Sequence, residues 1–217
     1  IADRLVEHKL ISLIPFEYAV IPKIENDFID RMWENSKDFI SPLHVEEVDW
    51  KALFIESCEI FEPKTGIRDF VDLLQVLRYL QTRELSGNIA EFGSFKGQSG
   101  YLIARFLNEI KSKKKLLMFD MFESFPIESM GVDQFWSETH EVNFPDIKEK
   151  FKNLDNVTLI KGDFMQTFES AECGELALVF VDCDSFRGTK YLIDNIFENR
   201  LVQGGIMVFE DYGHANL

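Results

Sequence analysis

The sequence predicts an α/β fold, in which an open and mainly parallel sheet carries helices on both faces and follows a helical N-terminal extension. The prediction depends on two observations. Short apolar segments, typical of buried strands, alternate five times with segments in which apolar residues recur at helical spacing. Each apolar segment also ends close to an acidic residue, and the carboxyl ends of parallel strands are where such sheets bind ligands.

The expected strands lie at the intervals of repeated β-α units, which connect through right-handed crossovers. They cover residues 88–92, 116–120, 157–164, 175–182 and 204–213. The fourth is a nearly continuous apolar run, as expected for a strand that is covered on both faces. In the helix after it, we expect four apolar residues to face inward: Leu192, Ile193, Ile196 and Phe197.

Helical patterns without strand-like alternation fill the first part of the chain, and residues 50–61 are one of them. We therefore divide the chain into a helical extension, 1–68, and a ligand-binding domain, 69–217. Asp69 is expected to cap the helix before the first strand, and Asp146 a short helix that reaches Leu154.

Composition excludes several classes of partner. The chain has 217 residues, and its 38 acidic and 23 basic residues give a net charge of −15, which disfavours nucleic acid and anionic membranes. The apolar stretch at 10–22 is interrupted by Pro15 and Glu17 and is too short to span a bilayer. The three cysteines show no disulfide or zinc spacing, which favours a reducing, cytoplasmic location.

The most informative stretch joins the first expected strand to the next helix and reads Glu91-Phe-Gly93-Ser-Phe-Lys-Gly97-Gln-Ser-Gly100. Glycines in such a turn allow unusual backbone angles and let a ligand approach closely. Their spacing differs from the Gly-x-Gly-x-x-Gly of dinucleotide sites, which disfavours an NAD-dependent dehydrogenase. It resembles motif I of the class I S-adenosylmethionine methyltransferases, which have a Rossmann-like fold. The alternative is that these glycines only ease packing.

Acidic residues at later strand ends form a second group of candidates. Asp120 is placed to accept hydrogen bonds from both hydroxyls of a ribose. Asp182 and Asp184 follow the fourth strand, and Glu210 and Asp211 end the fifth. Carboxylates at neighbouring strand ends suit Mg²⁺ or another hard divalent ion, which could orient a hydroxyl for attack on a sulfonium methyl group. The alternative is that these acids only cap the following helices.

Four segments together resemble the macrocin O-methyltransferase (TylF-like) family, metal-dependent enzymes that methylate sugar hydroxyls of natural products. The matching segments are 89–97, 120–125, 182–190 and 204–213, and the similarity covers roughly residues 69 to 213. The resemblance implies that Asp182, Glu210 and Asp211 hold Mg²⁺ or another divalent cation. It also implies that Asp182 is the general base, with Asp184 as the substitute.

The resemblance further implies a site for S-adenosylmethionine, in which Asp163 and Phe164 hold the adenine. The residues expected to contact this cofactor are Glu91, Gly93, Ser94, Gly97, Ser99, Asp120, Met121, Gly162, Asp163, Phe164 and Asp182. The expected acceptor is a small molecule with a hydroxyl group, a sugar or a glycosylated natural product. A homo-oligomer is compatible with the sequence.

Three features depart from the family pattern. Glu210 stands where the family has an aspartate, and Cys183 stands at a glycine position. Class I methyltransferase folds also add two more strands after the fifth. Since the sequence starts at Ile1 and stops at Leu217, we expect the intact protein to be longer.

An irregular stretch at 127–145 contains several aromatic residues and is expected to be a mobile lid over the acceptor. His140 lies in this stretch and could assist the acceptor, although an isolated histidine in a loop is more often a surface residue. Two other functions are open at this point. One is a methyltransferase for a different hydroxylated acceptor, such as a catechol-like diol, and the other is a non-catalytic protein that keeps the ligand pocket.

Overall fold

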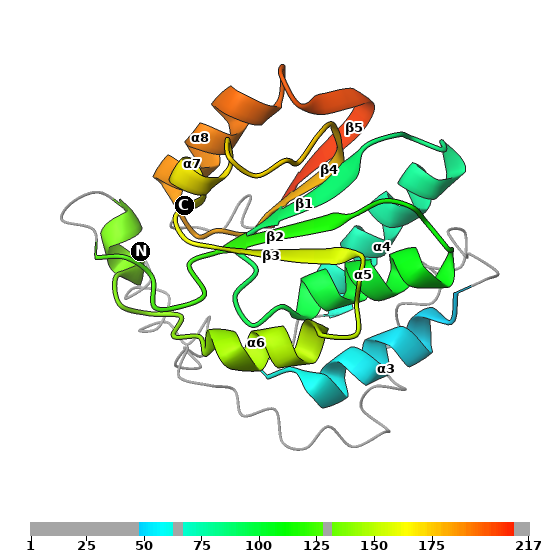
Figure 1. Cartoon of the computed structure of the whole chain (residues 1–217), viewed down its shortest axis with the longest axis horizontal. Coiled ribbons are helices and arrows are strands. Elements are labelled where there is room, and N and C mark those ends of the chain that lie inside the picture. The colour runs from blue at the N-terminus through cyan, green and yellow to red at the C-terminus, as the bar shows by residue number, and fades with distance from the viewer. Residues whose placement is uncertain (1–47, 63–66, 128–131, 211–217) are drawn as a thin grey trace, which may run out of the picture.

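The computed structural model describes residues 48–62, 67–127 and 132–210, which form a parallel sheet with helices on both faces (Figure 1). The sheet has five strands in the order β3-β2-β1-β4-β5, and every neighbouring pair is parallel. The strands are β1 (Asn88–Phe92), β2 (Leu116–Asp120), β3 (Val157–Lys161), β4 (Leu176–Val181) and β5 (Leu201–Phe209). The predicted fold class is confirmed, although β3 ends earlier and β5 begins earlier than expected.

Helices lie on both sides of the sheet (Figure 1). One face carries α4 (Ile67–Thr82), α5 (Gln98–Glu109) and α6 (Phe144–Phe151), with α3 (Trp50–Ile60) packed against α5, and the other carries α7 (Phe164–Thr167) and α8 (Phe186–Ile196). A hydrophobic core lies on each face of the sheet. Successive strand residues point to opposite faces, so Ile89 is buried in the core beneath α4 and α5, and Ala90 in the core beneath α8. None of the described helices is both long and apolar enough to cross a membrane.

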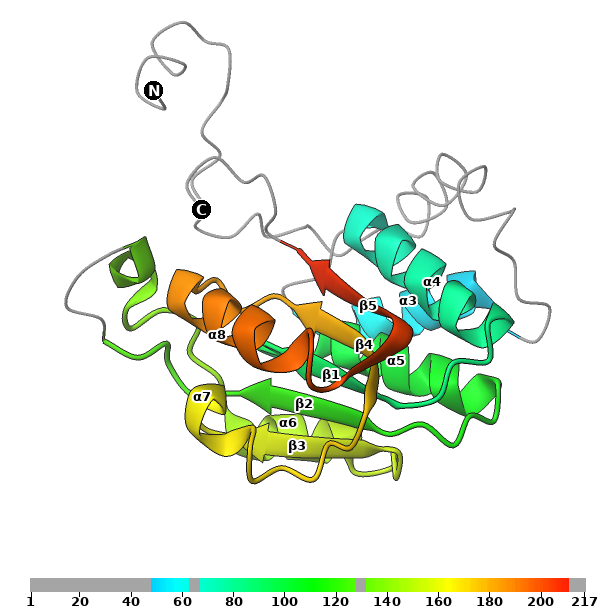
Figure 2. The ribbon, with the colours of Figure 1, turned by 90° about the horizontal axis from the view of Figure 1, so that it is seen from above.

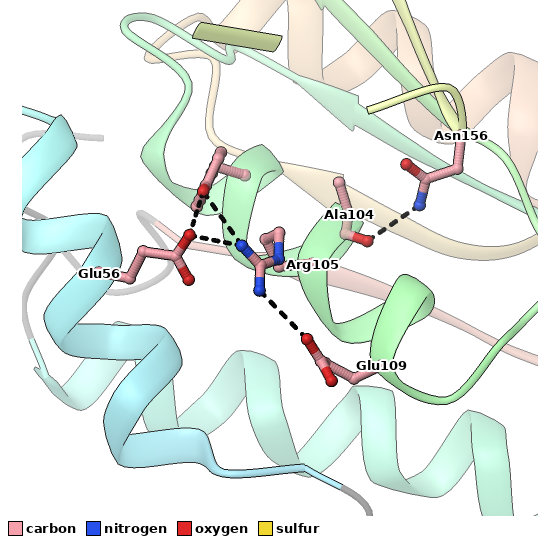
Figure 3. Close-up of polar contacts among 6 residues, drawn as sticks. Glu56, Ala104, Arg105, Glu109 and Asn156 are labelled. Atoms are coloured by element: carbon pink, nitrogen blue, oxygen red, sulfur yellow. Dashed lines mark hydrogen bonds and ion pairs between the residues drawn. The ribbon is translucent and has the colours of Figure 1, made fainter. Parts of the chain in front are cut away.

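Helix α3 belongs to the expected N-terminal extension, and it packs against α5. Trp50 stacks on Phe106 with ring centroids 4.8 Å apart. Arg105 of α5 forms an ion pair with Glu56 of α3 (Figure 3). Helix α3 therefore shares a core with α5. The division of the chain at residue 68 stays a prediction, because residues 1–47 lie outside the described residues.

Two expected helix caps are wrong. Helix α4 begins at Ile67, so Asp69 lies within its first turn and not at the N-cap. Helix α6 has Asn143 at its N-cap, and the Asn143 side-chain oxygen accepts a hydrogen bond from the Asp146 amide. Asp146 remains in the first turn of α6, where a negative charge favours the helix dipole.

Of the four residues expected to face inward on α8, two do so and two do not. Leu192 and Ile196 are fully buried, whereas Ile193 and Phe197 are 45% and 61% exposed. Residues four apart share a helix face, but the residue after each is turned by about 100°. Adjacent apolar residues on a short helix therefore cannot all reach the sheet.

The carboxyl ends of all five strands lie at one edge of the sheet, because every strand runs in the same direction (Figure 2). The strand order reverses between β1 and β4, and such a switch point is where open parallel sheets bind ligands. Phe92 pairs with Val181, and Val181 pairs with Phe209. The loops after β1, β4 and β5 therefore begin side by side.

Candidate functional site

The glycine turn after β1 is shaped by close contacts on several sides. Gly93 has φ +91°, and a Cβ atom there would lie 1.8 Å from the Asp182 carbonyl oxygen in the loop after β4. Gly97 has φ +94°, and its Cβ would lie 2.8 Å from the Phe151 ring. Gly100 leaves room for the Met118 methyl group, which would be 2.3 Å from a Cβ. Packing thus explains Gly97 and Gly100, and Gly93 is required where two strand ends meet.

Two buried polar atoms in this turn, one from Glu91 and one from Ser94, have no hydrogen bond. The Glu91 side chain is fully buried, and Oε1 accepts a hydrogen bond of 2.5 Å from the Ser99 hydroxyl. Among the described residues, neither Glu91 Oε2 nor Ser94 Oγ has a hydrogen-bond partner. Buried polar atoms are normally paired, so this pair fits a polar group that binds here.

Burial also governs the charge of Glu91. It raises the pKa of the carboxyl from 4.5 to about 7, and the hydrogen bond from the Ser99 hydroxyl only partly opposes this effect. The carboxyl is therefore divided between its neutral and charged forms near neutral pH. A cation beside Glu91 Oε2 would favour the charged form.

Asp120 connects the turns after β1 and β2. Its Oδ2 accepts a hydrogen bond of 2.7 Å from the Phe95 amide, and its Oδ1 accepts one of 2.6 Å from the Phe122 amide. Both phenylalanines have positive φ angles, 44° and 47°, which the two bonds help to hold. Burial raises the pKa of Asp120 to about 6. Each carboxylate oxygen keeps a second acceptor position, so contact with a ribose stays a prediction.

Asp163 has a structural role that the sequence did not indicate. Its Oδ1 accepts from the Met165 amide at 2.9 Å, which caps α7, and its Oδ2 accepts from Gln166 at 3.1 Å. Phe164 packs edge-on against Phe92, with ring centroids 5.4 Å apart. The contacts expected between these residues and an adenine stay predictions, as do those of Met121 and Gly162, which lie in the loops after β2 and β3.

The expected acidic group is partly brought together at the ends of β4 and β5. The Asp182 amide donates to the Phe92 carbonyl at 2.9 Å, and the Glu210 amide donates to the Val181 carbonyl at 3.0 Å, which makes the two acids neighbours across the strand pair. Asp211, the third expected metal ligand, lies outside the described residues. Within residues 48–62, 67–127 and 132–210 there is no group of three such side chains that could hold a metal ion.

Cys183 lies between the two candidate bases of this loop. Burial raises the pKa of the thiol to about 11, so the thiol stays protonated at neutral pH and does not act as a nucleophile. Its sulfur lies 3.5 Å from the Thr189 hydroxyl of α8. The next residue, Asp184, has φ 50°, in the left-handed region.

The expected lid contains a residue that sequence reasoning missed. Asp133 lies in a short 3-10 helix, η2 (Val132–Trp136), and its carboxylate accepts hydrogen bonds from Ser185, Phe186 and Arg187 at the start of α8. No sequence motif marks Asp133, because its partners lie more than 50 residues away in the chain. The described part of this stretch is thus attached to the sheet domain.

Solved structures with a similar fold include methyltransferases. The structure titled O-methyltransferase NovP is 20% identical, with a TM-score of 0.61, and the match covers 68% of this chain and 66% of that one, just under two thirds. CalS11, a calicheamicin methyltransferase, is 19% identical, with a TM-score of 0.54 over 88% of this chain and 80% of its own. At these identities the likeness shows the fold alone. The class is therefore an α/β fold of the methyltransferase type, with its polar residues at the carboxyl edge.

The family follows from the sequence itself. The model of the macrocin-O-methyltransferase (TylF) family matches residues 59–216, and the chain belongs to this family. The match begins ten residues before the expected domain boundary and includes the end of α3. No curated protein matches the sequence.

Proposed function

We propose that the protein is an S-adenosylmethionine-dependent O-methyltransferase that modifies a hydroxyl group of a sugar or glycosylated small molecule. The observation that carries the proposal is the unpaired couple of Glu91 Oε2 and Ser94 Oγ, buried in the glycine turn of a TylF-family chain. The amino group of the cofactor's methionine part is a cation with N–H donors. Such a group would satisfy both atoms and would favour the charged form of Glu91.

Other strand ends supply the remaining contacts of the proposed cofactor site. Asp120 retains one acceptor position on each oxygen for the ribose hydroxyls. Asp163 and Phe164 would bound the adenine, and Gly93 allows the turn to pass directly beside Asp182. The bound cofactor would supply a methyl group on a positively charged sulfur.

The acceptor side is proposed to lie over the loops after β4 and β5. An aliphatic hydroxyl has a pKa far above neutral, so its proton must leave as the new bond forms. Asp182, or Asp184 in its place, would accept that proton. Asp182, Glu210 and Asp211 would hold a divalent cation such as Mg²⁺, since carboxylates are the ligands that this ion prefers. The cation would stabilise negative charge on the hydroxyl oxygen.

Binding of S-adenosylhomocysteine, followed by calorimetry, tests the cofactor half of this proposal. Wild-type protein should bind, and Ser94→Ala should bind about tenfold more weakly, since one hydrogen bond to a charged group is lost. Ser112→Ala is the control, because the Ser112 oxygen accepts a hydrogen bond from the Lys114 amide just before β2 begins, at the opposite edge of the sheet. Absence of binding by wild-type protein would contradict the proposal.

Transfer of a labelled methyl group from S-adenosylmethionine tests the acceptor half. The panel should contain nucleoside-diphosphate sugars, glycosylated natural products and a catechol, each with Mg²⁺ or with EDTA. The proposal expects label on a sugar hydroxyl, with loss in EDTA and recovery with Mg²⁺. Label on the catechol alone would favour the other enzyme class. Binding of S-adenosylhomocysteine without transfer to any acceptor would favour a non-catalytic protein.

A further inference from the structure

Asp133 makes an unusual contact with the N-terminus of α8. The side chain is 7% exposed, and Oδ1 accepts from the Phe186 amide at 2.7 Å. Oδ2 accepts from the Ser185 hydroxyl at 3.0 Å and from the Arg187 amide at 3.2 Å. The first amides of a helix lack partners within the helix, and a negative charge there is favourable. Figure 2 shows η2, which carries Asp133, beside the start of α8.

The helix does not need Asp133 in order to be capped. Ser185 is its N-cap, and the Ser185 oxygen accepts from the Gly188 amide at 2.9 Å within the same turn. Asp133 therefore adds a second cap, which comes from a distant segment of the chain. This second cap holds η2 at a fixed distance from the loop after β4.

A second contact joins the same two parts of the chain. His140 follows η2, and its Nε2 lies 3.7 Å from Asp184 Oδ2, in the residue before Ser185. The His140 ring also contacts Phe95 of the glycine turn edge-on, at 5.1 Å between centroids. Residues 133–140 therefore bridge from the loop after β4 to the loop after β1, across the switch point of the sheet.

The backbone at these contacts needs outside support. Asp184 has φ 50° and His140 has φ 57°, both in the left-handed region that side chains disfavour. Such angles persist where the surrounding structure over-determines them. The three bonds from Asp133 begin one residue after Asp184, so they fix the direction in which the chain leaves it.

We infer that Asp133 is a positioning residue, which holds the Asp182–Asp184 loop and His140 in one arrangement on the acceptor side of the site. The inference rests on the proposed function, because that loop carries the proposed base and metal ligand. The Asp133 carboxylate binds the start of α8. Its effect on the site is therefore transmitted through Ser185 and the backbone amides of Phe186 and Arg187.

The first test compares Asp133→Asn with Asp49→Asn. Asp49 is the N-cap of α3, which has 11 residues like α8, and its Oδ1 accepts from the Ala52 amide at 3.0 Å, far from the strand ends. With the acceptor identified in the methyl-transfer panel, Asp133→Asn should lower kcat by about tenfold or more, because the base is misplaced. The Kd for S-adenosylhomocysteine should change less than about twofold, and Asp49→Asn should change neither value. An equal kcat in both variants would overturn the inference.

A second measurement does not depend on activity, so it separates this inference from the proposed function. Hydrogen exchange followed by mass spectrometry should become faster in Asp133→Asn in two places at once, residues 184–188 and residues 136–140. Asp49→Asn should leave both unchanged. Faster exchange confined to the first turn of α8 would make Asp133 a helix cap only. If Asp133→Asn does not fold, Ser185→Ala removes one of the three bonds to Asp133 together with the helix's own bond to the Gly188 amide, so only faster exchange in residues 136–140 would then support the inference, and its absence there would overturn it.

Discussion

The loops after β1, β2 and β3 are bound to one another directly at the strand ends, whereas the loop after β4 is bound by η2, which lies farther along the connection between β2 and α6. Asp120 accepts the Phe95 and Phe122 amides, and its carbonyl accepts the Gly162 amide at 2.9 Å. The loop after β4 is instead bound by Asp133. The proposed cofactor side is therefore fixed by the strand ends themselves, and the proposed acceptor side depends on a docked segment. Cofactor binding and acceptor chemistry should then respond differently to substitution.

The largest difference between the effect on turnover and the effect on cofactor affinity is expected for substitution of Asp182. Asp182→Asn removes both a proposed base and a proposed metal ligand, so turnover should fall by about a thousandfold. Glu210→Gln removes only a ligand and should fall less. Calorimetry should find S-adenosylhomocysteine affinity within about threefold of wild type in both variants, since the proposed contacts of Glu91, Ser94 and Asp120 with the cofactor are left in place. A larger loss in Glu210→Gln would exclude Asp182 as the base.

A smaller effect, on stability, is expected on the cofactor side at Gly93. Gly93→Ala places a Cβ atom 1.8 Å from the Asp182 backbone, and the free energy of unfolding should fall by about 3 kcal/mol or more. Gly162→Ala is the matched control. Its φ angle is also positive, at +127°, but its Cβ would meet only the Thr167 methyl group at 3.3 Å, so a loss of about 1 kcal/mol is expected.

Urea denaturation at pH 7 measures both glycine variants. Equal losses would mean that backbone angle alone matters at Gly93. In that case the contact between the two strand ends would not constrain the glycine turn.

The smallest effect expected is a pH dependence of stability. Burial raises the pKa of Glu91 from 4.5 to about 7, so the folded protein holds this proton more tightly than the unfolded chain does. Stability from this group is complete below pH 4.5 and is lost as the pH rises to 7, about 3 kcal/mol in total. Asp120 acts in the same direction, but its pKa is raised only to about 6, so half of its titration is over at pH 6 and only a smaller part of its effect remains above that pH.

Between pH 6 and 7 the larger part of the change therefore comes from Glu91. The free energy of unfolding of wild-type protein should fall by about 1 kcal/mol across this interval. In Glu91→Gln this group cannot titrate, so only the smaller fall that Asp120 contributes should remain. A fall of the same size in Glu91→Gln would assign the pH dependence to another group.

The sequence predicts the cofactor side better than the acceptor side, and the reason is distance along the chain. Strands and the glycine turn are local patterns, so β1 to β5 and the position of Glu91 follow from periodicity and spacing. The caps of α4 and α6 were misplaced by two or three residues, because several polar residues compete for each helix start.

Sequence patterns could not predict the hydrogen bonds that hold the loops of the site together. Asp120 and Asp163 each use both carboxylate oxygens to bind the protein itself, in addition to the ligand contacts that the sequence predicts for them. Asp133 lies in an irregular stretch and finds its partners only when β2 and β4 enter one sheet. Tertiary contacts of this kind depend on the fold and leave no periodic signal.

Hydrogen exchange of wild-type protein with and without S-adenosylhomocysteine tests the central claim most directly. The claim is that the glycine turn and the ends of β2 and β3 form the cofactor side, and that the segment around Asp133 does not. The ligand should slow exchange in residues 91–97, 120–122 and 162–164, and it should leave residues 132–138 and 186–188 nearly unchanged. Two results would contradict the account: slower exchange confined to residues 132–138 and 186–188, or no slowing of exchange in residues 91–97.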